Sequence, residues 1–302
     1  MTKKVKPKVK VTIGLCIKNC EATIKEALDS IKNQDYPHEL IEVIVVDGYS
    51  TDKTIQIVKE TLCRSDIKTK IFFENKGLGF ARQIVVDNAT GDYIIWVDGD
   101  MILAKDHVSK QVEFMEENPK VGIAGGKFQS YPGENWVAAL ESIEWIVSDY
   151  MHGNKASRRP ILHRAGGSIY RVEAIKQIGG FDIRIKGALE DLDAEYRMGD
   201  AGWLIYFITD AIFYDKRKET LKDIWVENFW YGYGGHYFMH KHKRPVQVSA
   251  ILQEFRRTAI AYKLMRRKMV FLLLFQYFFK KIAWFFGFLR AHLDGYGHNI
   301  TN

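Results

Sequence analysis

Two aspartates follow directly on an apolar run in the stretch IIWVDGD, residues 94–100. Apolar runs of this kind form buried strands, and an unpaired carboxylate near a core is costly. Because Asp98 and Asp100 are one residue apart, they could share a hard divalent cation and the ligand that it holds. The competing interpretation is an ordinary turn, since Asp-Gly pairs favour tight loops. The stretch alone is compatible with both.

The elements before these aspartates predict where other polar side chains lie. Residues 9–17, 41–47, 70–74 and 92–98 are apolar or β-branched runs typical of strands, and segments with helical spacing of apolar residues separate them. Strands that alternate with helices form a mostly parallel sheet covered on both faces. Ligands of such sheets bind beyond the carboxyl ends of the strands.

Several polar residues follow these strand ends, and we expect them to face one crevice. They are Lys18, Asn19, Asp47, residues 74–76, Asp98 and Asp100. A shared crevice of polar residues favours a binding site over a turn. The pattern therefore predicts an α/β fold with a Rossmann-like sheet and a ligand at its carboxyl edge.

The composition narrows the class of partner. The chain has 302 residues, 47% of them hydrophobic, and a formal net charge of +7. This balance excludes a disordered chain and indicates an anionic partner: nucleic acid, a membrane surface or a phosphorylated substrate. No RNA-binding signature accompanies the charge, so we do not expect nucleic acid. The three cysteines form no CxxC pair, which fits a reducing compartment and argues against a cysteine zinc site.

An ordered series of motifs runs through the first two thirds of the chain. The motifs are LCIKN at 15–19, VVDGYSTDKT at 45–54, NKGLGFAR at 75–82, VDGD at 97–100, GGSIYR at 166–171, GGFD at 179–182 and EDLDAEYR at 190–197. In this order the series resembles the GT-A glycosyltransferases of family 2, inverting enzymes that use nucleotide-diphosphate sugars. The resemblance covers about residues 10–215. It implies the GT-A fold and a glycosyltransferase activity.

The resemblance also implies a role for each matching residue. For the nucleotide, it implies that Asp47 binds the base or ribose, that Arg82 lies near the base or diphosphate, and that Cys16, Lys18 and Asn19 line the same pocket. Asp98 and Asp100 match the family's DxD motif, which approaches the ribose and binds a Mg²⁺ or Mn²⁺ ion. Asp191 matches the general base, although an acceptor that arrives ionised would need it only for orientation. The family often has a second aspartate where this chain has Gly48.

Three other interpretations remain beside this one. GLGFAR is similar to a dinucleotide fingerprint, but it has Arg82 where the final glycine or alanine belongs, so we do not expect NAD. Asp191 could be an acidic residue favoured by the dipole in the first turn of a helix. The whole chain could be a catalytically silent, membrane-bound scaffold of the same fold, although the DxD and Glu-Asp motifs argue against this.

From residue 216 onward the chain becomes helical, aromatic and basic, and we divide it into a catalytic domain, 1–215, and a C-terminal helical extension, 216–302. Residues 256–268 form a basic helix and residues 269–289 are very apolar. Lys280 and Lys281 fall near the middle of the apolar stretch, and a central lysine costs roughly 2.5–3.5 kcal/mol in a spanning helix.

This extension therefore predicts helices that lie in the plane of an anionic membrane surface, with a buried helical hairpin as the alternative. The stretch at 227–244 combines aromatic residues, glycines and a basic cluster, and its YGYGG with the following basic residues is similar to family members that glycosylate lipid-linked acceptors. We expect a peripheral enzyme on the cytoplasmic side of the membrane, which transfers a sugar to a lipid-linked glycan or a polyprenyl phosphate.

Overall fold

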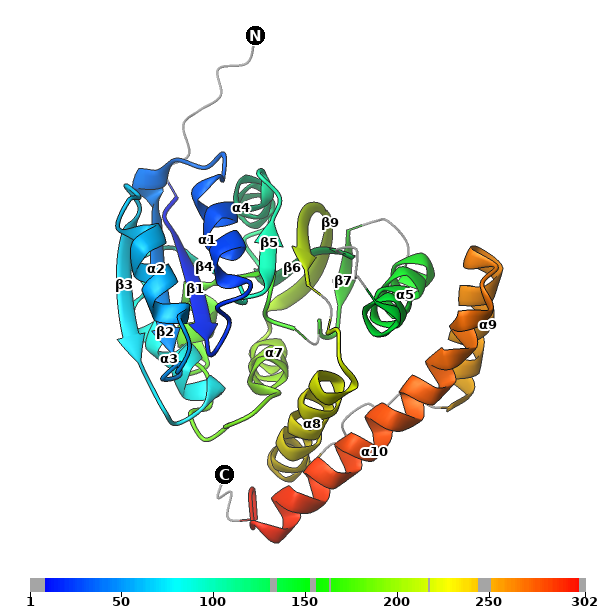
Figure 1. Cartoon of the computed structure of the whole chain (residues 1–302). Coiled ribbons are helices and arrows are strands. Elements are labelled where there is room, and N and C mark those ends of the chain that lie inside the picture. The colour runs from blue at the N-terminus through cyan, green and yellow to red at the C-terminus, as the bar shows by residue number, and fades with distance from the viewer. Residues whose placement is uncertain are drawn as a thin grey trace. The chain divides into compact units, whose positions relative to one another are not determined.

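The computed structural model of the chain describes residues 9–130, 135–152, 156–162, 164–216, 218–243 and 251–298 (Figure 1). The chain divides into two compact units. Unit 1 comprises Met1–Gln129, Lys155–Lys186 and Glu190–Asp215, and unit 2 comprises Ser130–Asn154, Gly187–Leu189 and Lys216–Asn302. The sequence-based division has the same border after residue 215 but keeps residues 130–154 in the catalytic domain.

Unit 1 is built on a sheet of nine strands among the described residues. Their order is β3-β2-β1-β4-β8-β6-β9-β5, and β7 pairs with β9. The strands are β1 (Val11–Ile17), β2 (Ile41–Asp47), β3 (Lys68–Phe73), β4 (Tyr93–Trp96), β5 (Met101–Leu103), β6 (Val121–Ser130), β7 (Ser157–Arg159), β8 (Ser168–Arg171) and β9 (Leu204–Asp215).

The first four strands run parallel, as their alternation with helices predicts. β1 pairs with β2 and β4, and β2 pairs with β3. In the register of β1 and β2, Ile17 lies opposite Asp47, so both strands end at the same edge. The later strands bring antiparallel pairs: β8 joins both β4 and β6, and β9 joins β5 and β7. They come from the part of the chain with the less regular sequence pattern.

Helices cover both faces of this sheet because successive strand residues point to opposite sides. Val43 and Val45 of β2 belong to a core that includes α1 (Ile24–Lys32), α2 (Thr54–Leu62) and α4 (His107–Glu117). Figure 1 shows α1 and α2 over the strands on this side. Ile44 and Val46 belong to a second core, which includes α3 (Leu78–Asn88), α6 (Val172–Gln177) and α7 (Glu190–Asp200). The sheet is therefore buried on both faces, and loops form the edge at the carboxyl ends of its parallel strands, where ligands of such sheets bind.

Unit 2 is helical and consists, among the described residues, of α5 (Trp136–His152), α8 (Leu221–His242), α9 (Ile251–Met265) and α10 (Leu272–Leu293). α8 and α10 pack through two glycines. A methyl group on Gly232 would overlap the carbonyl of Trp284, and one on Gly287 would overlap the carbonyl of Phe229. The two backbones are therefore in direct contact at this crossing.

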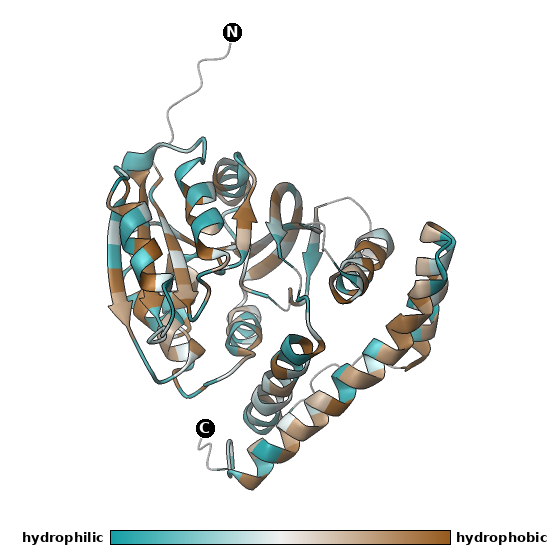
Figure 2. Cartoon of the chain, in the orientation of Figure 1, coloured by the Kyte–Doolittle hydropathy of each residue, from teal (hydrophilic) through white to brown (hydrophobic). Residues whose placement is uncertain are grey.

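Lys280 turns toward the interior of unit 2. Its Nζ lies 2.7 Å from Oε1 of Glu141 and 2.9 Å from Oε2 of Glu144, both on α5. The charge at the middle of the apolar stretch is therefore paired inside the unit. Large apolar side chains occupy the exposed face of α10, where hydrophobic colours dominate (Figure 2). They are Phe275, Phe278, Ile282, Phe285, Phe286, Leu289 and Leu293.

Candidate active site

The DxD motif forms the turn that joins β4 to β5. The backbone N–H of Met101 donates to the carbonyl of Asp98 at 3.1 Å, and the hydroxyl of Thr23 donates to the carbonyl of Gly99 at 2.7 Å. The space around this turn requires two glycines. A Cβ on Gly99 would lie 2.7 Å from Sγ of Cys20, and one on Gly166 would overlap the carboxylate of Asp98. The packing therefore fixes where the two aspartates stand.

The two carboxylates suit a hard cation. They are oxygen donors one residue apart on a tight turn, and such donors fit Mg²⁺ or Mn²⁺. The side chain of Asp98 is 45% exposed, so a ligand can reach it from solvent. Thus the sequence expectation of a metal-binding turn is compatible with the geometry.

Asp47 organises the loop that follows β2. Its carboxylate accepts from the backbone N–H of Ser50 at 2.8 Å and from the Ser50 hydroxyl at 2.6 Å. Asn19 ties this loop to the end of β1: its N–H donates to Oγ of Ser50 at 2.9 Å, and its Oδ1 accepts from the N–H of Thr51 at 2.8 Å. Since each carboxylate oxygen has two lone pairs, Asp47 keeps acceptor capacity for a ribose or base.

Lys18 lies over Gly48, where the family often has a second aspartate. A Cβ on Gly48 would be 3.2 Å from Cδ of Lys18. This is a tight contact, so a second aspartate at position 48 would have to displace the lysine side chain. Gly48 and Lys18 are therefore matched to each other.

Arg82 is the buried centre of the site. Its Nε lies 2.7 Å from Oε1 of Glu190, 108 residues later in the chain, and one of its terminal nitrogens lies 3.9 Å from Oδ1 of Asp98. The guanidinium also stacks over the ring of Trp96, 4.8 Å from its centroid. Cation–π contact and ion pairing together hold a desolvated arginine in one orientation. Arg82 thus links α3, the start of α7 and the first aspartate of the DxD motif.

Burial decides the protonation of the groups around Arg82. The pKa of Glu190 is raised to about 7, because burial and the nearby charge of Asp191 raise it by more than Arg82 lowers it. Burial also raises the pKa of the Cys16 thiol to about 12, with Arg82, Asp98 and Glu190 among its charged neighbours. Cys16 is therefore a neutral lining group at this place.

The second aspartate of the motif, Asp100, lies near Cys20. The pKa of the Cys20 thiol is raised to about 11, mainly by burial and in part by the charges of Asp52, Asp100 and Asp47, while a hydrogen bond with Thr54 lowers it. These carboxylates are therefore electrostatic neighbours of one thiol. Asp98 thus lies beside Arg82, and Asp47 and Asp100 both lie near Cys20.

Asp191 stands in the first turn of α7, where its Oδ1 accepts from the N–H of Leu192 at 2.7 Å. Its charge is one of those that raise the pKa of Arg82, together with Glu190 and Asp98. Leu189, just before the helix, has a left-handed backbone with φ +73°. Such a conformation is strained for a leucine, and strain of this kind concentrates at functional sites.

The sequence interpretation overlooked Glu190 as a partner of Arg82. Both residues stand in quoted motifs, but no local periodicity relates positions so far apart. The available signal for Glu190 was its place beside Asp191 in the same motif. Glu74, which the sequence places just past the end of β3, holds its loop: its Oε2 accepts from the N–H groups of Lys76 and Gly77 at 2.7 and 2.9 Å.

This arrangement has the fold and the acidic turn of a glycosyltransferase. The sequence model of glycosyl transferase family 2 matches residues 12–179, more than half of the chain, and the chain belongs to this family. It is a glycosyltransferase of the GT-A fold.

Two relatives illustrate the range of sequence similarity. EpsE of Bacillus subtilis, whose name places it among the glycosyltransferases, is 29% identical over 212 residues, which cover 68% of this chain and 72% of EpsE. The poly(ribitol-phosphate) β-N-acetylglucosaminyltransferase TarS of Staphylococcus aureus is 34% identical over 101 residues, which cover 33% of this chain and 18% of TarS.

Solved structures share the fold at lower identity. The mannosyltransferase PcManGT of Pyrobaculum calidifontis, in complex with GDP-Man and Mn²⁺, has a TM-score of 0.60 at 18% identity and covers 98% of this chain and 77% of its own. Residues 1–349 of TarS in complex with UDP-GlcNAc give a TM-score of 0.57 at 18% identity, and cover 95% and 92% of the two chains. These likenesses concern the fold.

Proposed function

We propose that the chain is an inverting, metal-dependent glycosyltransferase, which transfers a sugar from a nucleotide-diphosphate sugar to a lipid-linked glycan or polyprenyl phosphate at a membrane surface. The observation that carries the proposal is the convergence of Asp98, Arg82 and the Glu190–Asp191 pair at the carboxyl edge of the sheet. The complexes of PcManGT with GDP-Man and of TarS with UDP-GlcNAc support a donor of this class.

The donor would lie along the edge formed by β1, β2 and β4. The loops of Asn19 and Asp47 would bind the nucleoside, and the carboxylates of Asp98 and Asp100 would hold a Mg²⁺ or Mn²⁺ ion at the diphosphate. When bound, such a cation neutralises the negative charge that develops on the leaving group. The Mn²⁺ in the PcManGT complex supports this choice of ion.

Asp191 would accept the proton of the acceptor hydroxyl. An inverting displacement needs a base on the face opposite the leaving group. Arg82 occupies Glu190 in an ion pair, so the two neighbouring acids have separate roles: Glu190 positions the arginine, and Asp191 remains for the acceptor. With a phosphate acceptor, which arrives ionised, Asp191 would only orient it.

The exposed faces of α9 and α10 support a membrane location. The apolar side chains of α10 recur every three or four residues along one face, and Lys280 does not interrupt them, since it pairs with Glu141 and Glu144. Exposed basic residues flank this face: Arg256, Lys263, Arg266, Arg267 and Lys268. Apolar area with adjacent basic charge holds a helix in the interface plane of an anionic membrane.

Residues 268–293 are also long and apolar enough to cross a membrane. However, the opposite face of α10 packs on α8, which carries Asp223, Glu227 and Lys241. A spanning α10 would bring these charges into lipid or lose its packing on α8. We therefore favour the in-plane arrangement, peripheral on the cytoplasmic side.

Thermal unfolding in the presence of UDP, GDP and their sugars, with and without Mn²⁺, tests the donor site, because a bound ligand raises the melting temperature. We expect a Mn²⁺-dependent rise for the wild type, which Asp100→Ala abolishes without loss of the fold. Asp200→Ala, which removes an exposed carboxylate at the end of α7, is the matched control. Retained Mn²⁺-dependent binding by Asp100→Ala would contradict the assignment.

A turnover assay distinguishes an active glycosyltransferase from a catalytically silent scaffold of the same fold. An active glycosyltransferase slowly hydrolyses its donor when no acceptor is present, so we expect metal-dependent release of nucleoside diphosphate. A wild-type chain that binds the donor but releases no nucleoside diphosphate, with or without lipid acceptors, would support the scaffold.

A further inference from the structure

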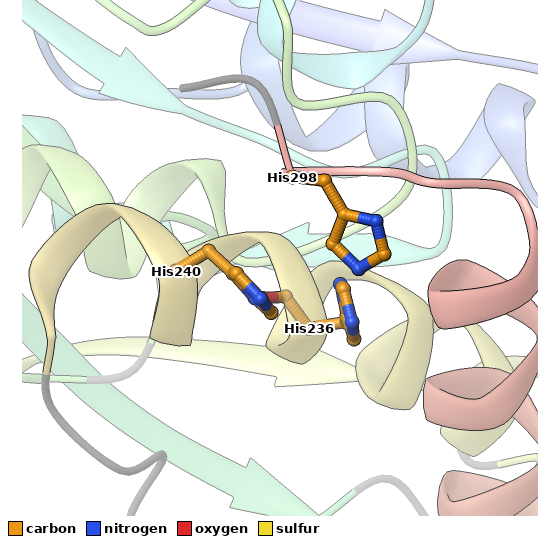
Figure 3. Close-up of side chains that lie close together, drawn as sticks. All are labelled: His236, His240 and His298. Atoms are coloured by element: carbon orange, nitrogen blue, oxygen red, sulfur yellow. The ribbon is translucent and has the colours of Figure 1, made fainter. Parts of the chain in front are cut away.

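Four histidines gather at one end of unit 2. His236 and His240 lie one turn apart on α8, His292 is in the last turn of α10, and His298 follows α10. Figure 3 shows the rings of His236, His240 and His298 side by side. Their ring centroids are 4.3 Å apart for His236 and His240, and 5.3 Å from each of these to His298. One ring nitrogen from each of the three lies within 4.8 Å of the others.

Hydrogen bonds to backbone carbonyls fix the tautomers of the two α8 histidines. Nδ1 of His236 lies 2.6 Å from the carbonyl of Tyr296, and Nδ1 of His240 lies 2.9 Å from the carbonyl of His236. A carbonyl oxygen only accepts, so both Nδ1 atoms carry the proton and both Nε2 atoms keep a lone pair. A metal-binding histidine usually donates its other N–H in this way, which fixes its ring for coordination.

The ring nitrogens of His292 and two of its neighbours have the spacing expected for ligands of one metal ion. Nδ1 of His292 lies 3.2 Å from Nε2 of His236 and 3.3 Å from Nε2 of His298. Zinc–nitrogen bonds are about 2.0–2.1 Å long and the coordination is tetrahedral, which places neighbouring ligand atoms about 3.3–3.4 Å apart. A hydrogen-bonded network accounts for these approaches less well, because a single proton on His292 can serve only one of its two neighbours.

The turn that carries His298 is held against α8 by aromatic packing. The ring of Tyr296 stacks on Tyr233 at 4.7 Å and packs on Tyr237 at 4.9 Å. Gly297, with φ +94°, lies so close that a Cβ would be 3.1 Å from Cα of Tyr237. The position of His298 therefore does not depend on the histidine contacts alone.

We propose that His236, His240 and His298 bind one divalent transition-metal ion, Zn²⁺ in the first place, with His292 as the fourth nitrogen ligand. Imidazole nitrogens suit Zn²⁺, Cu²⁺ or Ni²⁺, whereas carboxylates suit Mg²⁺ and Mn²⁺, so this site and the DxD site select different ions. Four protein ligands leave no open position, which is typical of structural zinc. The ion would tie the end of α8 to the segment after α10.

Titration of the metal-free full-length chain with Zn²⁺, and with Co²⁺ as a spectroscopic probe, tests the site. To remove the other metal site, the titration is done in the Asp98→Asn/Asp100→Asn background. We expect one tight Zn²⁺ equivalent, a visible Co²⁺ spectrum of tetrahedral coordination, and a melting temperature that rises with Zn²⁺. His298→Gln should weaken Zn²⁺ binding at least about tenfold and remove the tetrahedral spectrum, because loss of a residue that only hydrogen-bonds a metal ligand already costs about 10–100-fold.

His242→Gln is the matched control, because it removes a histidine from the same helix, two residues beyond His240, without touching the cluster. This variant should bind Zn²⁺ as the parent does. His298 is exposed and lies beyond the last helix, so its substitution leaves the helical packing of unit 2 in place, and circular dichroism verifies this. Equal Zn²⁺ affinity and stoichiometry for parent and His298→Gln, or no tight binding by the parent, would overturn the proposal.

Discussion

Arg82 is the residue that links Glu190 and Asp98 in the candidate active site. It is buried, pairs with Glu190, stacks over Trp96 and approaches Asp98. Removing one partner of a buried ion pair leaves an uncompensated charge and costs about 3–5 kcal/mol. Substitutions of Arg82 or Glu190 to alanine would therefore confuse stability with catalysis, and tests of function belong on Asp191.

Asp191→Asn should leave donor binding nearly intact and reduce sugar transfer by about 10²–10⁴-fold, the usual contribution of a positioned base. The measurement is kcat for transfer beside the dissociation constant of the donor. Asp200→Asn, in the last turn of the same helix, should transfer at the wild-type rate. Full activity of Asp191→Asn would mean that the acceptor arrives ionised, and would favour a polyprenyl phosphate over a sugar hydroxyl.

Glu190 makes the stability of the chain depend on pH. Its pKa is about 7 in the folded chain, above the value of 4.5 for an unburied glutamate, so the folded state holds the proton to higher pH. Stability therefore falls as the pH rises from about 4.5 to about 7. Urea unfolding at pH 5 and pH 8 should show a smaller loss for Glu190→Gln than for the wild type. Glu173→Gln changes an exposed residue of α6 and should show the same difference in unfolding free energy between pH 5 and pH 8 as the wild type. If Glu190→Gln also kept the wild-type difference, Glu190 would not be the group responsible for the pH dependence.

At the scale of elements, the α8–α10 pair shows why a glycine-rich segment can form a helix interior. α8 contains YGYGG, which lowers helix propensity, yet it runs unbroken from Leu221 to His242. Close backbone contact at Gly232 and Gly287 offsets this cost, because it brings the aromatic side chains of both helices together. Trp225 packs against Phe279 and Phe286 across the pair, with ring centroids 5.4 and 5.9 Å apart.

Gly287→Ala should separate these helices, because the new methyl group meets the backbone of Phe229. Overpacking of this kind costs about 1–3 kcal/mol, which outweighs the gain of an alanine in a helix. Gly199→Ala in α7 is the matched control, since nothing lies within 4 Å of its Cβ position. Unfolding free energies should fall for Gly287→Ala and stay equal or rise for Gly199→Ala. Equal effects of the two changes would contradict the close crossing.

At the scale of the whole molecule, charge and exposed apolar area combine in the C-terminal helices. The net charge of +7 agrees with an anionic partner, and the basic residues of α9 stand beside the apolar face of α10. Each lysine or arginine near an anionic surface adds about 1 kcal/mol of attraction, which salt screens. Membrane binding is therefore expected to depend on both lipid charge and ionic strength.

The enzyme should sediment with anionic liposomes, and high salt should release a substantial share of it. Ile282→Lys should weaken this binding, because it places a charge in the apolar face. Ile183→Lys is the control: both isoleucines are 50% exposed, but Ile183 belongs to unit 1. Release by detergent alone would favour a spanning α10, and no sedimentation at all would make these helices a soluble cap.

The sequence alone was sufficient for the local features of the fold. The alternation of strands and helices up to residue 100 predicts the four parallel strands, and the polar residues at their ends predict one shared edge. These inferences hold because side-chain period and turn chemistry act over a few neighbouring residues. The motif series also identified the family to which the chain belongs.

Tertiary structure decided everything that joins distant positions. Arg82 and Glu190 are 108 residues apart, and Lys280 and Glu144 are 136 apart, yet both pairs are in hydrogen-bond contact. Because Lys280 pairs with Glu144, the charge that interrupts the apolar sequence of α10 lies inside unit 2. The contact of His298 with the histidines of α8 likewise joins residues that are far apart in the sequence. No short-range pattern encodes such pairs, because they arise only when packed elements bring their side chains together.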